Sequence, residues 1–307
     1  MHAVPIALLF ACACCSKAQV DMTAQDPASP PQRPVIVAGY DLGAPARSFL
    51  LPDELHEISA IAAADDHTLA CVQDEKGALF FFDLDQGRIV RRAKFGPRGD
   101  YEGLAKVGGE YWVLRSDGVL LRLVAAEDRF EIAETLATGL PVKEFEGLAV
   151  DNAANRFVLA PKSVAKETEE RELRPLFAFD LATRLAAKEP LLTLRLDEVL
   201  DAARLQGINV PTRTTKRGKE KPSVRLFFAE VAMHPQTGDL WLLSASDRAL
   251  LVVDRNGQFR GMHFFSAAEM PQPEAATFLP NCDLVLGSEG AGGQAVLRVY
   301  ARVTQPR

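Results

Sequence analysis

Five short phrases, each a glutamate followed by small and apolar residues, decide the fold of this 307-residue chain. They are HEISAIA (56–62), YEGLAKV (101–107), FEGLAVD (145–151), AEVAMHP (229–235) and PEAATFLP (273–280). Their glutamates are separated by 45, 44, 84 and 44 residues. Near-equal spacing is typical of repeat architectures, and the long interval indicates one unit that carries an insertion.

Each unit consists of short apolar runs separated by turn residues. In the first unit the runs are SAIAAA (59–64), TLACVQ (68–73), ALFFFDL (78–84) and RIVRRAKF (88–95). Four such strands in a unit of about 40–45 residues are typical of a propeller blade. The sequence therefore predicts an all-β fold, a β-propeller of five four-stranded blades. Six blades are the alternative, if the long third unit contains another one.

The last unit contains only three strand-like runs, ATFLP (276–280), DLVLGSE (283–289) and AVLRVYA (295–301). The run PVIVAGYDL (34–42) precedes the first unit and has no partner of its own. We expect this N-terminal strand to complete the last blade, because closing the ring removes the open sheet edges.

The N-terminus differs from the rest of the chain. Residues 1–20 contain an apolar run and the sequence Leu9-Phe10-Ala11-Cys12, which resembles a bacterial lipoprotein signal peptide with Cys12 as the lipidated residue. Residues 21–33 are polar and proline-rich and are predicted to be a tether. Residues 34–307 then form a single propeller domain in the bacterial cell envelope. There the protein is either a lipoprotein anchored at the plasma membrane or a periplasmic protein.

The composition of the chain indicates which classes of binding partner to expect. The net charge of −6 argues against nucleic-acid binding, which needs clustered Lys and Arg. No run of about 20 apolar residues occurs in the body, so we expect membrane contact only through the N-terminal anchor. Cys71 and Cys282 are isolated and are expected to be buried free thiols. A monomer is expected.

In a propeller the first strand of each blade lines the channel, so residues at its start meet at one mouth. The five phrases place Glu57, Glu102, Glu146, Glu230 and Glu274 there. The second strands run back and end at the same mouth, with Asp74, Glu75, Asp117, Lys162, Asp247 and Glu289. The sequence therefore predicts a ring of mostly acidic side chains at one mouth.

Crowded carboxylates raise one another's pKa unless a cation offsets their charge. Ca²⁺ prefers oxygen ligands and is the candidate ion, with Glu102, Glu146, Glu230 and Glu274 as its candidate ligands. The alternative is that each glutamate accepts backbone N–H groups of the next blade and ties blades together. His56 is the histidine best placed for acid–base chemistry. The chain lacks the G-x-S-x-G, H-E-x-x-H and P-loop motifs.

Two insertions, at about 162–175 and 197–222, lengthen the third unit. The second begins with an amphipathic helix whose apolar residues are Leu196, Val199, Leu200 and Ala203. A basic stretch follows, with Arg213, Lys216, Arg217, Lys219 and Lys221. It is expected either to cover the acidic mouth or to bind anions there, or to be a solvated loop.

The phrases DYEGLA and FEGLA, together with QDEKG, LSASDRALLVV and GSEG, resemble the SdiA-regulated (YjiK-like) family of bacterial envelope proteins. The similarity covers about residues 50–300. It implies a propeller of unassigned activity, an envelope location and a calcium ion in the channel.

Two functions remain open. The first is a binding or scaffold propeller, with a protein, a glycan or a small molecule as ligand at the channel mouth. The second is a calcium-dependent hydrolase that resembles esterase, lactonase and phytase-like propellers. The sequence has no clear catalytic base, which favours the first function.

Overall fold

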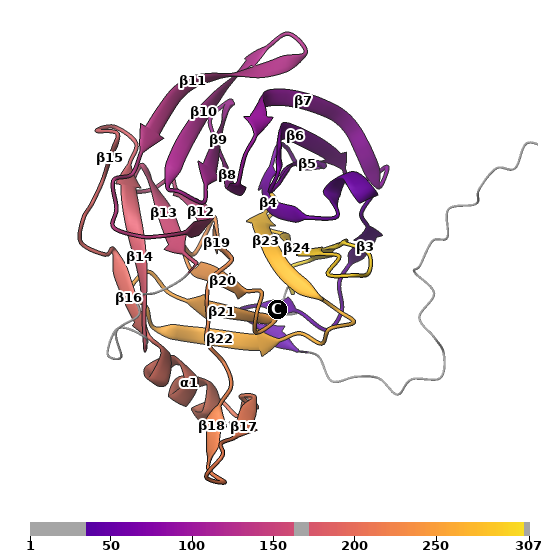
Figure 1. The fold of residues 1–307 in the computed structure, drawn as a ribbon. Helices are drawn as coiled ribbons and strands as arrows, with labels where there is room; N and C mark the ends of the chain where they lie inside the picture. Colours follow the sequence, from indigo (N-terminus) through magenta and orange to yellow (C-terminus); the bar gives the residue numbers. More distant parts are fainter. Residues whose placement is uncertain (1–34, 163–171, 304–307) are drawn as a thin grey trace, which may run out of the picture. The chain divides into compact units, whose positions relative to one another are not determined.

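The computed structural model describes residues 35–162 and 172–303. Five antiparallel sheets stand around a central channel as the blades of a β-propeller (Figure 1). The predicted fold is confirmed, and the alternative of six blades is wrong. The extra length of the third unit forms an α-helix and a small hairpin in the described residues instead of a blade.

The blades follow one another along the chain, and each begins with its channel-lining strand. Blade 1 consists of β4 (Ile58–Ala63), β5 (Thr68–Gln73), β6 (Lys76–Asp83) and β7 (Arg88–Arg98). Blade 2 consists of β8 (Tyr101–Val107), β9 (Glu110–Arg115), β10 (Val119–Ala126) and β11 (Arg129–Ala137). Blade 3 consists of β12 (Phe145–Asp151), β13 (Arg156–Pro161), β14 (Leu173–Asp180), β15 (Leu185–Ala186) and β16 (Leu192–Arg195), and the last two share the outer position beside β14. Blade 4 consists of β19 (Glu230–Met233), β20 (Leu240–Ser244), β21 (Ala249–Val253) and β22 (Phe259–Phe264).

Blade 5 joins the two ends of the domain. Three strands come from the C-terminal part, β23 (Gln272–Phe278), β24 (Leu284–Glu289) and β25 (Val296–Tyr300). The fourth, β3 (Arg47–Leu50), comes from the N-terminal part and pairs with β25. Closure by an N-terminal strand is therefore observed, but the run 34–42 is not the strand that provides it.

The run 34–42 instead forms a small hairpin of β1 (Ile36–Val37) and β2 (Tyr40–Asp41). Its anchor is Tyr40, which is fully buried against Trp241 and Phe278. The Tyr40 hydroxyl donates to the carbonyl oxygen of Cys282 at 2.6 Å and lies 3.0 Å from Nε2 of His234. A buried tyrosine needs such a partner for its hydroxyl group, and this need places the hairpin against blades 4 and 5 rather than in the last sheet.

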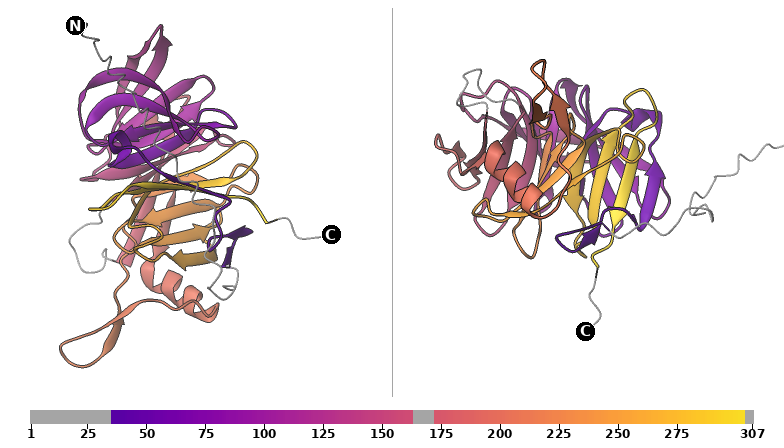
Figure 2. Two further views of the ribbon diagram at one scale, coloured as in Figure 1. Left: turned by 90° about the vertical axis from the view of Figure 1, so that its right-hand side faces the viewer. Right: turned by 90° about the horizontal axis from the view of Figure 1, so that it is seen from below.

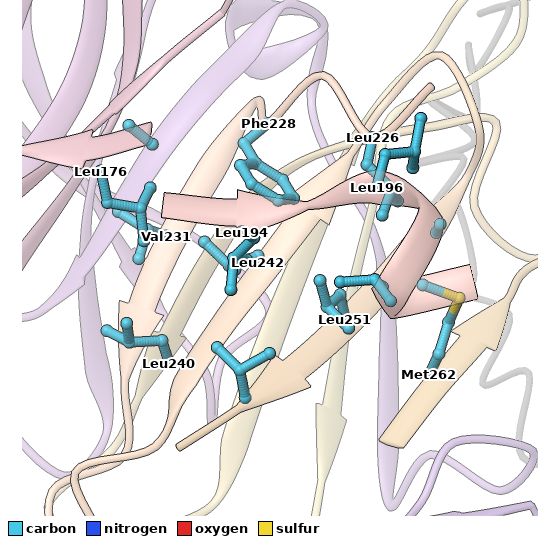
Figure 3. Close-up of a cluster of buried hydrophobic side chains, with 14 of the residues drawn as sticks. Leu176, Leu194, Leu196, Leu226, Phe228, Val231, Leu240, Leu242, Leu251 and Met262 are labelled. Atoms are coloured by element: carbon cyan, nitrogen blue, oxygen red, sulfur yellow. The ribbon is translucent and has the colours of Figure 1, made fainter. Parts of the chain in front are cut away.

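The inserted helix α1 (Leu196–Leu205) packs across the outer strands β16 and β22. The four residues predicted for its apolar face, Leu196, Val199, Leu200 and Ala203, are all buried. Figure 3 shows the core beneath the helix, a buried cluster that contains Leu194 and Leu196 together with Leu251 and Met262 from blade 4. The helix therefore fills the outer part of the interface between blades 3 and 4.

The basic stretch after the helix forms a hairpin of β17 (Thr212–Thr214) and β18 (Glu220–Pro222). Its cationic residues Arg213, Lys216, Arg217, Lys219 and Lys221 are all exposed. Figures 1 and 2 show this hairpin beyond α1, outside the ring of blades. This position agrees with the expectation of a solvated segment and not with a lid over the channel.

Several predictions concern residues outside the described ranges. The signal peptide with Cys12 and the tether lie in residues 1–34, and most of the first insertion lies in residues 163–171. In the described part of the chain, no helix has the length and apolar character needed to cross a membrane. Cys71 and Cys282 are buried free thiols, as predicted.

The role of α1 can be tested with two leucines of the same helix. Leu200 is 3% exposed and Leu205 is 89% exposed. We expect Leu200→Ala to lower the free energy of unfolding by about 2–5 kcal/mol, because it leaves a cavity in the core between blades 3 and 4. Leu205→Ala is the control and should change it by less than about 0.5 kcal/mol. Urea denaturation followed by circular dichroism measures both, and equal effects would contradict this packing.

Candidate functional site

The glutamates of three phrases stand on β-bulges. The pairing of β8 with β9 skips Glu102, that of β12 with β13 skips Glu146, and that of β23 with β24 skips Glu274. A bulge re-aims the side chain of the extra residue. In blade 1 the skipped residue is Ser59, so Glu57 lies two residues before the equivalent position. The three bulged glutamates therefore occupy equivalent positions, which Glu57 does not share.

The bulged glutamates and several neighbouring acids lie close enough to affect one another's ionisation. Burial raises the pKa of Glu102 to about 8, and the charges of Glu146 and Asp100 add to this effect. Burial also raises the pKa of Asp74, with a further contribution from Glu57. We call this group the acidic mouth; its carboxyl groups belong to Glu57, Asp74, Asp100, Glu102, Glu144, Glu146, Glu230, Glu274 and Glu289.

Lys162 brings a positive charge into the acidic mouth. Its ammonium group pairs with Oε1 of Glu146. Burial lowers the pKa of Lys162, but the bond to Glu146 and the charges of Glu146, Glu102 and Glu144 outweigh burial and raise it above its usual value. Burial raises the pKa of Glu146 to about 7, even though Lys162 opposes this shift. Lys162 is thus a cation that several of these carboxyl groups share.

Glu274 and Glu289 form a pair of carboxyl groups joined by a hydrogen bond. The side-chain amide of Gln272 donates to both, at 2.7 Å to Glu274 and 2.8 Å to Glu289. Burial, followed by the bond to Glu289 and its charge, raises the pKa of Glu274 to about 8. Two adjacent carboxyl groups cannot both ionise easily, so at neutral pH the pair shares one proton.

Glu230 is only 1% exposed and behaves differently from the bulged glutamates. Its Oε1 accepts the backbone N–H groups of Val231 at 2.8 Å and of Leu148 at 3.0 Å. Leu148 belongs to blade 3, so this carboxyl group ties blades 3 and 4 together. Its Oε2 is buried and has no hydrogen-bond partner in the described part of the chain. Burial raises the pKa of Glu230 far above its usual value, and the charges of Glu146 and Glu102 add to this.

Three further candidate acids bind partners of their own. Asp247 accepts the backbone N–H groups of Arg225 and Leu226 and the hydroxyl group of Ser244. In two exposed ion pairs, Asp117 pairs with Arg115 and Glu75 pairs with Arg98. These contacts hold the ends of the second strands and leave the inner carboxyl groups described above as the candidate site.

His56 lies beside the loop that follows β24. Its Nε2 is 3.2 Å from the carbonyl oxygen of Gly293, and its own carbonyl oxygen accepts the N–H of Gly290 at 3.1 Å. A Cβ atom on Gly290 would stand 2.3 Å from the imidazole, so a glycine is needed there. These contacts hold the loop, and a catalytic role of His56 stays a prediction.

A cavity of about 450 Å³ opens beside Lys162 and Glu146, between blades 3, 4 and 5. Glu274, Gln272, Ser246 and Arg248 also line it, and Phe227, Ala229, Ala245 and Pro271 provide apolar walls. It can accommodate a small polar head group with an apolar part.

A calcium ion needs six to eight oxygen ligands around one point. Among residues 35–162 and 172–303, no three His, Cys, Asp or Glu side chains are grouped so that they could hold a metal ion. Lys162 stands among the carboxyl groups that were expected as ligands. The side chains in this arrangement do not fit a metal ion, and the calcium ion stays a prediction from the sequence.

The sequence analysis missed Asp100, Glu144 and Gln272, which also take part in the site. Each lies two residues before a bulged glutamate, in the sequences Asp100-Tyr-Glu102, Glu144-Phe-Glu146 and Gln272-Pro-Glu274. Side chains two residues apart in a strand point to the same face. A polar residue two positions before a bulged glutamate is therefore the sequence signal that could have identified Asp100, Glu144 and Gln272.

The raised pKa values predict how stability depends on pH. In the folded protein Glu102 holds its proton up to about pH 8, whereas the unfolded chain loses it near the usual value of 4.5. This contribution to stability is therefore present below pH 4.5 and is lost as pH rises through 8. We expect Tm to fall between pH 7 and 9 and Glu102→Gln to reduce this fall.

The control is Glu198→Gln, whose side chain is 72% exposed and which should leave the pH profile unchanged. Differential scanning calorimetry measures the three profiles. The lowered pKa values of His234 and His263 affect stability below their usual value of 6.5, outside the chosen range. Identical slopes for Glu102→Gln and the unaltered protein would contradict the assignment.

No model of a known protein family matches the chain, and no curated protein matches it. The glutaminyl cyclase of Myxococcus xanthus is a similar solved structure, with a TM-score of 0.55 and 14% identity over 84% of this chain and 95% of that chain. Streptogramin B lyase has a TM-score of 0.46 and 11% identity over 82% and 97%. The WD40 domain of Neurospora crassa Pan2 has a TM-score of 0.40 and 12% identity over 83% and 66%. At such identities the likeness to the cyclase shows the fold alone, which is the β-propeller.

Proposed function

We propose that this chain is a binding propeller whose acidic mouth holds the positively charged part of a ligand. The observation that carries the proposal is the crowding of Glu102, Glu146 and Glu274 around Lys162, with Glu289 beside Glu274, next to an open cavity. The buried Oε2 of Glu230, which lacks a hydrogen-bond partner in the described residues, adds an acceptor nearby. A cationic group is the chemistry that such a set of acceptors binds best.

Binding of a cation is coupled to the ionisation of these groups. Glu102 and Glu274 have pKa values of about 8 and are therefore mostly protonated at pH 7. A bound cation favours their charged form and lowers their pKa. Binding should consequently release protons, and affinity should increase with pH between 6 and 8.

The location of the protein and its family are proposals that rest on the sequence. The lipoprotein-like segment with Cys12 supports an envelope protein, and the phrases DYEGLA and FEGLA support a relation to the SdiA-regulated (YjiK-like) family. In that setting the ligand would be a protein, a glycan or a small molecule that carries a cation.

Calorimetric titration tests the binding function. We expect residues 34–307 to bind n-butylamine hydrochloride at pH 7 with release of a proton, detected as a dependence of the heat on the ionisation enthalpy of the buffer. A parallel titration with CaCl₂ tests a metal ion as the alternative cation. Glu102→Gln and Glu274→Gln should each weaken binding by about tenfold, equivalent to about 1.4 kcal/mol.

Glu198→Gln on the exposed face of α1 is the matched control and should bind like the unaltered protein. Sodium pentanoate, which has the same butyl chain with a negative charge, should give no heat. If neither cation binds, the proposed function is wrong.

The second candidate function is a hydrolase that uses a carboxyl group as general acid or base. The pair of Glu274 and Glu289, which shares one proton and is oriented by Gln272, favours it. A carboxyl group with a pKa near 8 can give and take a proton near neutral pH, as general acid–base catalysis requires. The pair also borders the cavity, through Glu274.

An activity screen decides between the two functions. A hydrolase should cleave an aryl ester or a lactone, and Glu274→Gln should reduce kcat by about 10²–10⁴, the usual contribution of a general acid or base. Asp117→Asn at the same mouth, in an exposed ion pair, is the control and should keep the activity. Absence of turnover by the unaltered protein, with intact cation binding, would leave the binding function alone.

A further inference from the structure

Lys162 breaks the pattern of the second strands. It follows directly on β13, at the position that Asp74, Ser116, Ser244 and Glu289 occupy in the other blades by strand register. Its backbone N–H donates to the carbonyl oxygen of Glu144 at 3.0 Å, and this hydrogen bond positions the backbone of Lys162. Its ammonium group then reaches Oε1 of Glu146. Blade 3 thus contributes a cation at a position where blades 1 and 5 contribute an acid.

The surroundings of Lys162 suit an ammonium group and not a metal ion. Its charge acts on Glu102, Glu146 and Glu274, one glutamate from each of blades 2, 3 and 5. Glu230, the glutamate of blade 4, already uses one oxygen to accept two backbone N–H groups. In the described ranges no three acidic or imidazole side chains converge as metal ligands.

The cavity beside Lys162 offers what an alkyl chain needs. Its apolar walls are Phe227, Ala229, Ala245 and Pro271, and its polar lining consists of Glu146, Lys162, Ser246, Arg248, Gln272 and Glu274. Apolar walls beside a carboxyl group fit a molecule with a short hydrocarbon stem and a charged end. The Lys162 side chain has this chemistry itself, and it is half-exposed, so small molecules can reach its position from solvent.

We propose that Lys162 is the built-in cation of the acidic mouth, and that the mouth is an alkylammonium site whose ligand class is the primary amine. This deepens the proposed function, on which the ligand class rests. The Lys162 ammonium group provides the positive charge that a metal ion would otherwise bring to these carboxyl groups. An incoming amine binds to the carboxyl groups that do not pair with Lys162, and its alkyl chain lies along the apolar walls of the cavity.

Chemical rescue tests whether these carboxyl groups bind an ammonium group at the position of the Lys162 side chain. Lys162→Ala removes three methylene groups and the ammonium group, which together correspond to n-propylamine. We expect Lys162→Ala to lower Tm by about 5 °C, because Glu146 stays buried without its cation. Millimolar n-propylamine should restore at least half of this loss, whereas n-propanol and CaCl₂ should not.

Two further variants keep the test decisive. Lys162→Met fills the same space without a charge, so it should be destabilised like Lys162→Ala but should gain nothing from n-propylamine. Lys188→Ala, at an exposed lysine of blade 3, should show neither the loss nor the rescue. If Lys162→Ala does not fold, the Tm of Lys162→Met, measured with and without CaCl₂ and a chelator, still separates the two kinds of cation.

The outcomes distinguish this inference from the proposed function. An unchanged Tm of Lys162→Ala, or a loss that n-propylamine does not restore, would overturn the inference. A rise in the Tm of the unaltered protein with CaCl₂ and a fall with chelator would reveal a metal site, which overturns the inference and keeps the binding function. Rescue of Lys162→Ala, when neither n-butylamine nor CaCl₂ binds to the unaltered protein, would support the position of the Lys162 ammonium group among these carboxyl groups, but it would overturn the ligand class and the binding function.

Discussion

The hydrogen-bonded ladder between β3 and β25 is the constraint on which the rest of the structure depends. It joins residues 47–50 to residues 296–299 and so closes the ring of blades. A closed ring forces the first strand of every blade to face the channel, and it removes the open edges that two incomplete sheets would expose. The acidic mouth follows from this closure, because residues far apart in the chain come together only when the blades surround one channel.

Closure also creates an electrostatic problem that the chain resolves locally. Carboxyl groups from four phrases are partly or fully buried near one another, and burial alone disfavours their charged forms. Three interactions reduce the free-energy cost of burying these carboxyl groups. They are the ion pair of Lys162 with Glu146, the shared proton of Glu274 and Glu289, and the backbone N–H groups bound by Glu230. The Oε2 atom of Glu230 is still without a hydrogen-bond partner in the described residues, and this acceptor contributes to the proposed ligand site.

The interfaces between the blades rely on buried polar contacts as well as on apolar packing. At the end of β12, the fully buried Asp151 binds Arg255 of blade 4 at 2.9 and 3.1 Å, and it also pairs with Arg156. Glu230 joins the same two blades at the acidic mouth. Helix α1 covers their outer strands, so the interface between blades 3 and 4 is held at both ends and along its outside. The cavity lies beside this interface.

The repeat of about 44 residues, with its period-two strands, determined the number of blades and the acidic character of one mouth, because a regular pattern states which residues are equivalent. The apolar face of α1 was equally predictable, since Leu196, Val199, Leu200 and Ala203 follow helical spacing. Only the tertiary structure decided which N-terminal strand closes the ring, because the burial of Tyr40 against Trp241 determines where residues 36–41 lie. It also decided that Ser59 and not Glu57 is equivalent to the bulged glutamates, and that Lys162 meets Glu146, since a bulge and an ion pair depend on register and distance, which the order of residues does not contain.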